Sequence, residues 1–148
     1  MRVLLDTNVL ISHLLSLQRK SLVNHVLEAA FLGEIDLLFP KEVLDELGKK
    51  IPQKPYLAER ITPQQVEQLV TLLAEISEGI ATITMEIPAV TRDPKDDYLI
   101  AYALVGGADY LVTGDADLLI LEKVEDVEIV TPRELEQCIA SGGTSPRP

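Results

Sequence analysis

Residues 2–8 read Arg2-Val3-Leu4-Leu5-Asp6-Thr7-Asn8, and residues 110–117 read Tyr110-Leu111-Val112-Thr113-Gly114-Asp115-Ala116-Asp117. In both stretches a short apolar run, typical of a strand buried on both faces, ends in acidic residues. Two strands would therefore deliver carboxylates to one edge of a sheet. Carboxylates about 4 Å apart repel by roughly 1 kcal/mol in water and about 4 kcal/mol at an effective dielectric constant near 20, so a cluster favours a bound cation. The two stretches predict a divalent metal site.

The rest of the chain alternates between strand and helix patterns. Short apolar runs predict strands at residues 2–5, 36–39, 81–83, 110–113 and 127–130. Helical patterns occupy residues 9–17, 21–32, 41–49, 63–77, 94–105 and 133–140. This alternation predicts a three-layer α/β/α sandwich with a central, mainly parallel five-stranded sheet. Right-handed crossovers place the strand carboxyl ends at one edge, where ligands bind in such folds.

Local signals set several boundaries. Thr62-Pro63 and Thr131-Pro132 each supply an N-cap followed by proline at the first helical position. Residues 51–55 break the helical pattern and predict a hinge between helices. We expect a single domain over residues 1–140 and a flexible tail over residues 141–148.

Composition favours a cytoplasmic protein. A chain of 148 residues is about one domain, and its single cysteine, Cys138, cannot form an intrachain disulfide. The first residues enter a strand directly, where a signal peptide would need a longer apolar run. No stretch approaches the roughly 20 apolar residues of a membrane span. We therefore expect no membrane insertion.

The net charge of −11 argues against a simple nucleic-acid-binding module, which usually carries a basic face. It argues less against a metal-dependent nuclease, because several acids would be ligands and each divalent ion adds two positive charges. Local basic clusters occur at Arg19-Lys20, at Lys49-Lys50 with Lys54, and at Arg92 with Lys95. Their ordinary interpretation is a solvated surface.

Asp6 ends the first strand and could cap the following helix. Asn8 could do the same, so capping alone does not require Asp6, and we predict that Asp6 is a metal ligand. Thr7 and Asn8 could position a water or a phosphate oxygen, or merely begin the helix.

The helix predicted at residues 41–49 carries two candidate acids. A helical wheel places Glu46 nearest the edge of the apolar face and therefore partly shielded. Glu42 lies in the first turn, where it offsets the positive end of the helix dipole. Function and solvated surface explain Glu46 equally well.

The segment Asp93-Pro94-Lys95-Asp96-Asp97 separates three aspartates. Asp93 before proline predicts an N-cap, and Asp96 three residues later completes something like a capping box. Asp97 lacks such a role and heads a buried stripe formed by Ile100, Ala101 and Leu104. A carboxylate at a core-facing edge should be paired, protonated or metal-bound, so we predict a metal or catalytic role for Asp97.

The turn after the fourth predicted strand carries Asp115 and Asp117. Asp115 could cap a short helix and Asp117 could complement its dipole, but a functional role is favoured for Asp115. Thr113 could hold a nucleophilic water or a phosphate oxygen, or be an ordinary strand-end hydroxyl. The chain lacks a G-x-G-x-x-G motif and a P-loop, and His13 and His25 have no nearby cysteine. A carboxylate-rich, all-oxygen site suits Mg²⁺ or Mn²⁺.

Four segments in order resemble the PIN-domain family, and in particular the VapC-like toxins of prokaryotic type II toxin-antitoxin systems. They are residues 4–10, 43–47, 97–101 and 111–118, and the likeness spans residues 2–130. The resemblance implies an acidic quartet of Asp6, Glu46, Asp97 and Asp115. It also implies Asp117 as a possible additional ligand and Thr7, Asn8 and Thr113 as assisting residues. Glu42 competes with Glu46, Asp96 with Asp97, and Asp117 with Asp115.

The resemblance further implies a metal-dependent endoribonuclease that cleaves RNA, forms a homodimer and is inhibited by a cognate antitoxin. Metal-assisted phosphodiester hydrolysis is the expected mechanism. One alternative is a receiver-like phospho-acceptor module, although Val127-Glu128-Ile129-Val130-Thr131-Pro132 lacks the lysine that such a module needs. The other is an inactive PIN scaffold that only binds a partner.

Overall fold

The structure, a computed structural model, describes residues 1–17, 21–84, 86–89 and 91–141. The predicted basic cluster Arg19-Lys20 lies outside these residues, and so does the predicted tail beyond Ser141.

Strands and helices alternate along most of the chain. The strands are β1 (Arg2–Leu5), β2 (Asp36–Pro40), β3 (Glu78–Ile80), β4 (Tyr110–Val112), β5 (Lys123–Val124) and β6 (Val127–Val130). The helices are α1 (Thr7–Leu15), α2 (Leu22–Phe31), α3 (Lys41–Gln53), α4 (Pro55–Arg60), α5 (Pro63–Ile76), α6 (Pro94–Val105), α7 (Ala116–Leu119) and α8 (Pro132–Ala140).

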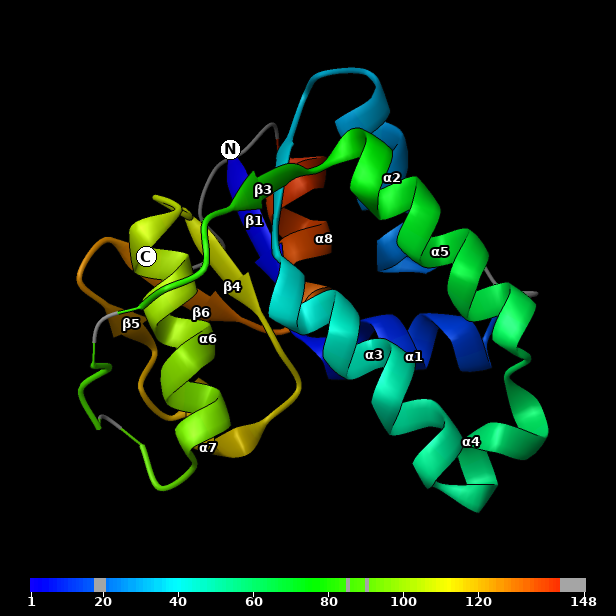
Figure 1. Cartoon of the computed structure of the whole chain (residues 1–148). Coiled ribbons are helices and arrows are strands. Elements are labelled where there is room, and N and C mark those ends of the chain that lie inside the picture. Colours follow the sequence, from blue (N-terminus) through cyan, green and yellow to red (C-terminus); the bar gives the residue numbers. More distant parts are fainter. Residues whose placement is uncertain (18–20, 85, 90, 142–148) are drawn as a thin grey trace.

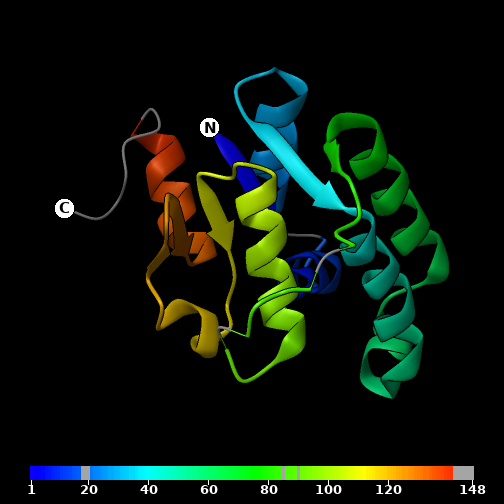
Figure 2. The same ribbon diagram turned by 60° about the vertical axis from the view of Figure 1, so that its left-hand side comes forward.

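One sheet runs in the order β3-β2-β1-β4-β6-β5, and its pairs are parallel except for β5 with β6. Helix α6 covers one face of the sheet, whereas α2, α5 and α8 lie on the other (Figures 1 and 2). The predicted α/β/α architecture with a mainly parallel sheet is thus confirmed. Among the described residues, no helix combines the length and apolarity needed to span a bilayer.

The central strands are buried on both faces, as their unbroken apolar runs predict. Val3, Leu4 and Leu5 of β1 are each 0% exposed, and so are Leu111 and Val112 of β4. The register pairs Leu5 with Val112, so the next residues of the two strands, Asp6 and Thr113, lie side by side at the carboxyl edge.

The direction of winding reverses between β1 and β4. The chain moves outward from β1 to β2 and β3, then returns through α6 to place β4 on the other side of β1. Ligand sites in open α/β sheets lie outside the carboxyl ends of the strands at such a switch point. In Figure 1 this edge is the lower one, where α1 and α6 begin and α7 lies.

The sheet differs from the prediction in two ways. The third strand is Glu78–Ile80 rather than residues 81–83, because its pairing with Leu38–Pro40 of β2 positions it at an edge, where an apolar run is not required. The sequence prediction also missed β5, making the sheet six-stranded. This strand has only two residues, too few for a periodic pattern, and turns into β6 through Glu125 with φ of 51°.

Helix boundaries follow the predicted caps closely. The Thr62 and Thr131 hydroxyls accept hydrogen bonds from the backbone N–H groups of Gln65 and Glu134, at 3.2 and 3.1 Å. Both helices have proline in the first turn, as predicted, and the structure adds a capping box at each. Of the predicted hinge at residues 51–55, only Lys54 lies outside a helix, between α3 and α4.

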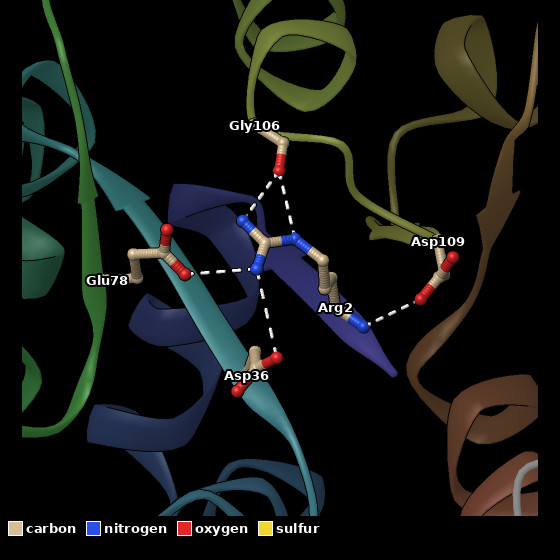
Figure 3. A network of polar contacts seen from close by, with 5 residues as sticks. All are labelled: Arg2, Asp36, Glu78, Gly106 and Asp109. Carbon is tan, nitrogen blue, oxygen red and sulfur yellow. Dashed lines mark hydrogen bonds and ion pairs between the residues drawn. The ribbon is translucent and has the colours of Figure 1, made fainter.

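Arg2 joins the opposite, amino edge of the sheet (Figure 3). Its Nη1 lies 3.0 Å from Oε2 of Glu78 and 3.8 Å from Oδ2 of Asp36. Its Nε and Nη2 donate to the carbonyl oxygen of Gly106, at 3.0 and 2.8 Å, and its backbone N–H donates to Asp109 at 2.8 Å. The guanidinium thus ties the edge strand β3 to the C-terminal end of α6, where a cation also complements the helix dipole.

Candidate functional site

Asp6 stands at the carboxyl end of β1, in the N-cap position of α1, but its side chain makes no capping hydrogen bond. The carboxylate instead accepts the hydroxyl hydrogen of Thr113, with 2.7 Å between Oγ1 and Oδ2. Thr113 is 0% exposed, and its Oγ1 also accepts the backbone N–H of Asp115 at 3.0 Å. One buried hydroxyl therefore links the two acidic stretches that dominate the sequence.

Asp96 is the acid of α6 that meets this pair. Asp93 accepts the N–H of Lys95 at 2.9 Å, as the predicted N-cap requires, but the structure shows no capping box through Asp96. The Asp96 side chain is buried and lies beside Asp115. Burial is the main cause that raises the pKa of Asp96 to about 7. The neighbouring carboxylates Asp115, Asp93 and Asp6 contribute to the same rise, in that order.

Asp97 is equally buried but holds a backbone group of the preceding connection. Its Oδ1 accepts the N–H of Thr91 at 2.7 Å. Thr91 in turn donates its hydroxyl to the carbonyl oxygen of Asp93 at 2.9 Å. Asp97 thus fixes the path of the chain that leads into α6.

Glu46 is the acid of α3 that lies near Asp6. The Thr7 hydroxyl donates to Oε2 of Glu46 at 3.3 Å, and Lys95 Nζ lies 4.0 Å from Oε1. Glu42, one turn earlier, interacts with the buried Tyr102. Its Oε2 is buried and has no hydrogen-bond partner among the described residues. The two acids that the sequence left in competition therefore occupy different surroundings.

Asp115 is half-buried, whereas Asp117 is exposed. Asp115 is the N-cap of α7 and accepts the N–H of Asp117 at 2.9 Å. Asp117 is 56% exposed and lies 3.9 Å from Arg92. Asn8 is also exposed, and its Oδ1 accepts a hydrogen bond from Lys50 Nζ at 3.0 Å.

The electrostatics of the cluster suit a divalent cation. Burial is the main cause of a raised pKa at Asp6, and the nearby Glu46 adds to it. The hydrogen bond from Thr113 opposes the rise, and so do the nearby backbone N–H of Asn8 and the charge of Lys50. The half-buried carboxyl group of Asp6 and the buried one of Asp96 are thus costly to ionise without a compensating charge. A bound divalent ion reverses this balance.

The ligand set fits Mg²⁺ or Mn²⁺ better than a metal that needs a closed cage. Within the described part of the chain, no three side chains of His, Cys, Asp or Glu already gather as a metal site. Mg²⁺ keeps several water ligands and is commonly held by one or two carboxylates, so oxygen atoms from Asp6 and its neighbours meet its needs.

Sequence reasoning favours Asp97 over its competitor Asp96, although a signal for Asp96 exists. Residues at i+3, i+4 and i+7 from Asp96 are Leu99, Ile100 and Ala103, which are all buried. The corresponding residues for Asp97 include Ala101 and Leu104, which are only half-buried. The stripe headed by Asp96 is therefore the deeper of the two.

Comparison with known proteins agrees with this architecture. The model of the PIN domain family matches residues 2–117. Among solved structures, a chain of VapBC2 from Rickettsia felis, bound to a DNA fragment from their promoter, superposes with a TM-score of 0.58 and 14% sequence identity. The match covers 88% of this chain and 98% of that chain, and at this identity it shows the shared fold. A search of curated proteins found no match. Because the family model covers most of the chain, the protein belongs to the PIN-domain family.

Proposed function

We propose that the protein is a divalent-metal-dependent endoribonuclease. The observation that carries the proposal is the Thr113 hydroxyl, which links half-buried Asp6 to the Asp115 loop at the switch point between β1 and β4. The buried Asp96 lies beside Asp115 at the same point. Acids that are costly to ionise together have a physical reason to bind Mg²⁺ or Mn²⁺. The choice of RNA rests on the resemblance to VapC-like toxins.

Asp6, Asp96 and Asp115 would hold the ion, with Glu46 and Asp117 as further ligands, directly or through water. The sequence predicted Asp97 for this set. We favour Asp96 because it interacts with both Asp115 and Asp6, whereas Asp97 supports the chain at Thr91. When bound, the ion would lower the pKa of a water molecule and neutralise charge at the scissile phosphate.

The remaining polar residues position these acids. Thr113 orients Asp6 and the Asp115 loop through its buried hydroxyl. Thr7 does the same for Glu46. Asn8, which is exposed beside Lys50, is available to a phosphate oxygen or a water of the substrate.

We further propose that the protein is the toxin of a toxin-antitoxin pair, acts in the cytoplasm as a homodimer and is inhibited by a partner protein. The fold shared with a chain of the VapBC2 complex supports this proposal. Co-expression with candidate antitoxins, followed by co-purification, tests the partner, and light scattering tests the dimer.

The deciding experiment is cleavage of single-stranded and structured RNA by the purified protein with Mg²⁺, Mn²⁺ or EDTA. Asp6→Asn serves as the site variant, and Lys123→Gln, on exposed β5, serves as the matched control. We expect metal-dependent cleavage that is lost in Asp6→Asn and kept in Lys123→Gln. Isothermal titration with Mn²⁺ gives a second readout, and a wild-type protein that neither binds Mn²⁺ nor cleaves RNA would refute the proposal.

A further inference from the structure

Three cations lie around the acidic cluster, two beside its acids and one beside Asn8. Lys50 Nζ donates to Asn8 at 3.0 Å. Lys95 Nζ lies 4.0 Å from Glu46. Arg92 Nη2 lies 3.9 Å from Asp117. We call Lys50, Arg92 and Lys95 the rim cations.

The rim cations come from different parts of the chain. Lys50 lies on α3, which follows β2, and its partner Asn8 follows β1. Arg92 precedes α6, and its partner Asp117 follows β4. β2, β1 and β4 are adjacent strands about 4.8 Å apart, so the cations are distributed across the site rather than gathered on one side.

The ion pairs of the rim cations contribute too little to the stability of the fold to explain why these cations lie there. The side chains of Arg92 and Lys95 are 92% and 76% exposed, and the N···O distances of their ion pairs are long, at 3.9 and 4.0 Å. Exposed pairs of this kind contribute about 0–1 kcal/mol. The cations are therefore free to exchange a carboxylate for a phosphate with little loss to the fold.

An aromatic side chain extends the same surface. Tyr98 is 49% exposed and follows Lys95 by three residues on α6, so the two side chains share one face of the helix. An exposed tyrosine beside phosphate-binding cations is the arrangement on which unpaired bases stack. Duplexes bury the faces of their bases, so this pairing of groups favours a single strand.

We propose that the rim cations and Tyr98 form a binding track for single-stranded RNA, with three phosphate contacts and one stacking platform across the acidic cluster. The inference rests on the proposed function and names the part of the molecule that holds its substrate. It also resolves a difficulty of charge. A chain of net charge −11 repels polyanions overall, but here the positive groups lie where the scissile phosphate must come.

The test measures the salt dependence of binding. Fluorescence anisotropy with a labelled single-stranded RNA of mixed sequence is recorded between 50 and 200 mM salt, on the order of the range over which phosphate contacts are resolved. Ca²⁺, which also takes oxygen ligands, replaces Mg²⁺, and a gel of each sample shows whether the RNA is intact. The variants are Lys50→Gln, Arg92→Gln, Lys95→Gln and Tyr98→Ala.

Each lost phosphate contact should reduce the slope of log K against log salt by about 0.7. Tyr98→Ala should instead weaken binding about 5- to 150-fold without changing the slope. The matched controls are Lys49→Gln, an exposed neighbour of Lys50, and Tyr56→Ala, an exposed tyrosine of α4. Both should keep the wild-type slope and affinity. A duplex of the same sequence should be insensitive to Tyr98→Ala.

Two results would overturn the track. One is an unchanged slope in all three rim variants, and the other is an equal change in Lys49→Gln and Lys50→Gln. In either case, metal-dependent cleavage by the wild type would leave the proposed function standing. Conversely, RNA binding that depends on the rim cations without any cleavage in Mg²⁺ or Mn²⁺ would support the track and count against the nuclease.

Discussion

Thr113 donates its hydroxyl hydrogen to Asp6 across the junction of β4 and β1, with 2.7 Å between the two oxygen atoms. The same oxygen accepts the backbone N–H of Asp115. A strand-end threonine thus sets the orientation of an acid on the neighbouring strand and of the loop that carries another. The sequence leaves Thr113 open between a partner of a water or phosphate oxygen and an ordinary strand-end hydroxyl.

Replacing Thr113 with valine keeps the shape of the side chain but removes this link. We expect Thr113→Val to weaken Mn²⁺ binding and cleavage about 10- to 100-fold, as is usual when a ligand loses its supporting hydrogen bond. Thr113→Ser retains the hydroxyl and should stay close to wild type. Isothermal titration and initial cleavage rates check both variants, and equal losses in the two would show that packing, not the hydrogen bond, matters.

Asp96 should make stability fall with rising pH in metal-free buffer. Its pKa of about 7 exceeds its ordinary value, so between about pH 4 and pH 7 the folded protein holds a proton that the unfolded chain has released. The bound proton of Asp96 makes its whole contribution to the free energy of unfolding below about pH 4. Between about pH 4 and pH 7 that contribution declines by up to about 1.4 kcal/mol per pH unit. Raised pKa values at both Asp6 and Asp96 act in the same direction.

Urea unfolding in EDTA at pH 5 and pH 8 measures the effect. Asp96→Asn should gain stability relative to wild type as the pH rises, because asparagine does not ionise. Mg²⁺ should stabilise the wild type more at pH 8 than at pH 5, since protons compete with the ion for the carboxylates. Parallel pH curves for wild type and variant would contradict the assignment.

Substitutions of the two adjacent acids of α6 should have different effects on metal binding and cleavage. Asp96→Asn should abolish metal-dependent cleavage and weaken Mn²⁺ binding, because Asp96 lies close enough to Asp115 and Asp6 for both carboxylates to raise its pKa. Asp97→Asn retains an acceptor for the Thr91 N–H and should lower activity less, with Mn²⁺ affinity close to wild type. Titration calorimetry separates the two roles. A larger loss of Mn²⁺ affinity in Asp97→Asn than in Asp96→Asn would instead identify Asp97 as the metal ligand.

Glu46 and Glu42 form a matched pair on α3. Glu46→Gln should reduce cleavage about 10-fold or more, because Glu46 lies beside Thr7 and close enough to Asp6 to raise its pKa. Glu42→Gln should keep the cleavage rate and raise the free energy of unfolding by about 1 kcal/mol, since it removes the negative charge of a carboxylate that has a buried, unpartnered oxygen. Rates and urea midpoints measured side by side decide between the two acids.

Arg2 should matter for stability alone. Arg2→Gln breaks the contacts to Glu78 and Gly106 at the edge opposite the acidic cluster. We expect a loss of about 1–2 kcal/mol in the free energy of unfolding, a range that allows for the partial exposure of the guanidinium. Cleavage per folded molecule should not change. Urea unfolding checks the loss against Lys123→Gln, and equal stabilities would show that the network contributes nothing measurable.

Local sequence determined much of this protein. The apolar runs of β1 and β4 require burial on both faces, so a parallel sheet with Asp6 and Asp115 at its carboxyl edge follows from the order of residues alone. The caps at Thr62 and Thr131 are equally local, because a capping residue and its partner lie three positions apart.

Tertiary structure decided which side chains of each helix enter the site and where the edge strand lies, because both depend on residues distant in sequence. Asp96 and Asp97 are adjacent in sequence but point about 100° apart on a helix, so only the docking of α6 against β4 selects which one meets Asp115. Glu42 and Glu46 lie one turn apart on α3, so the neighbouring segments rather than helix rotation give the two acids different surroundings. Likewise, the edge strand β3 is positioned by β2 rather than by its own apolar pattern. The rim cations surround one site only because three adjacent strands end at the same edge of the sheet.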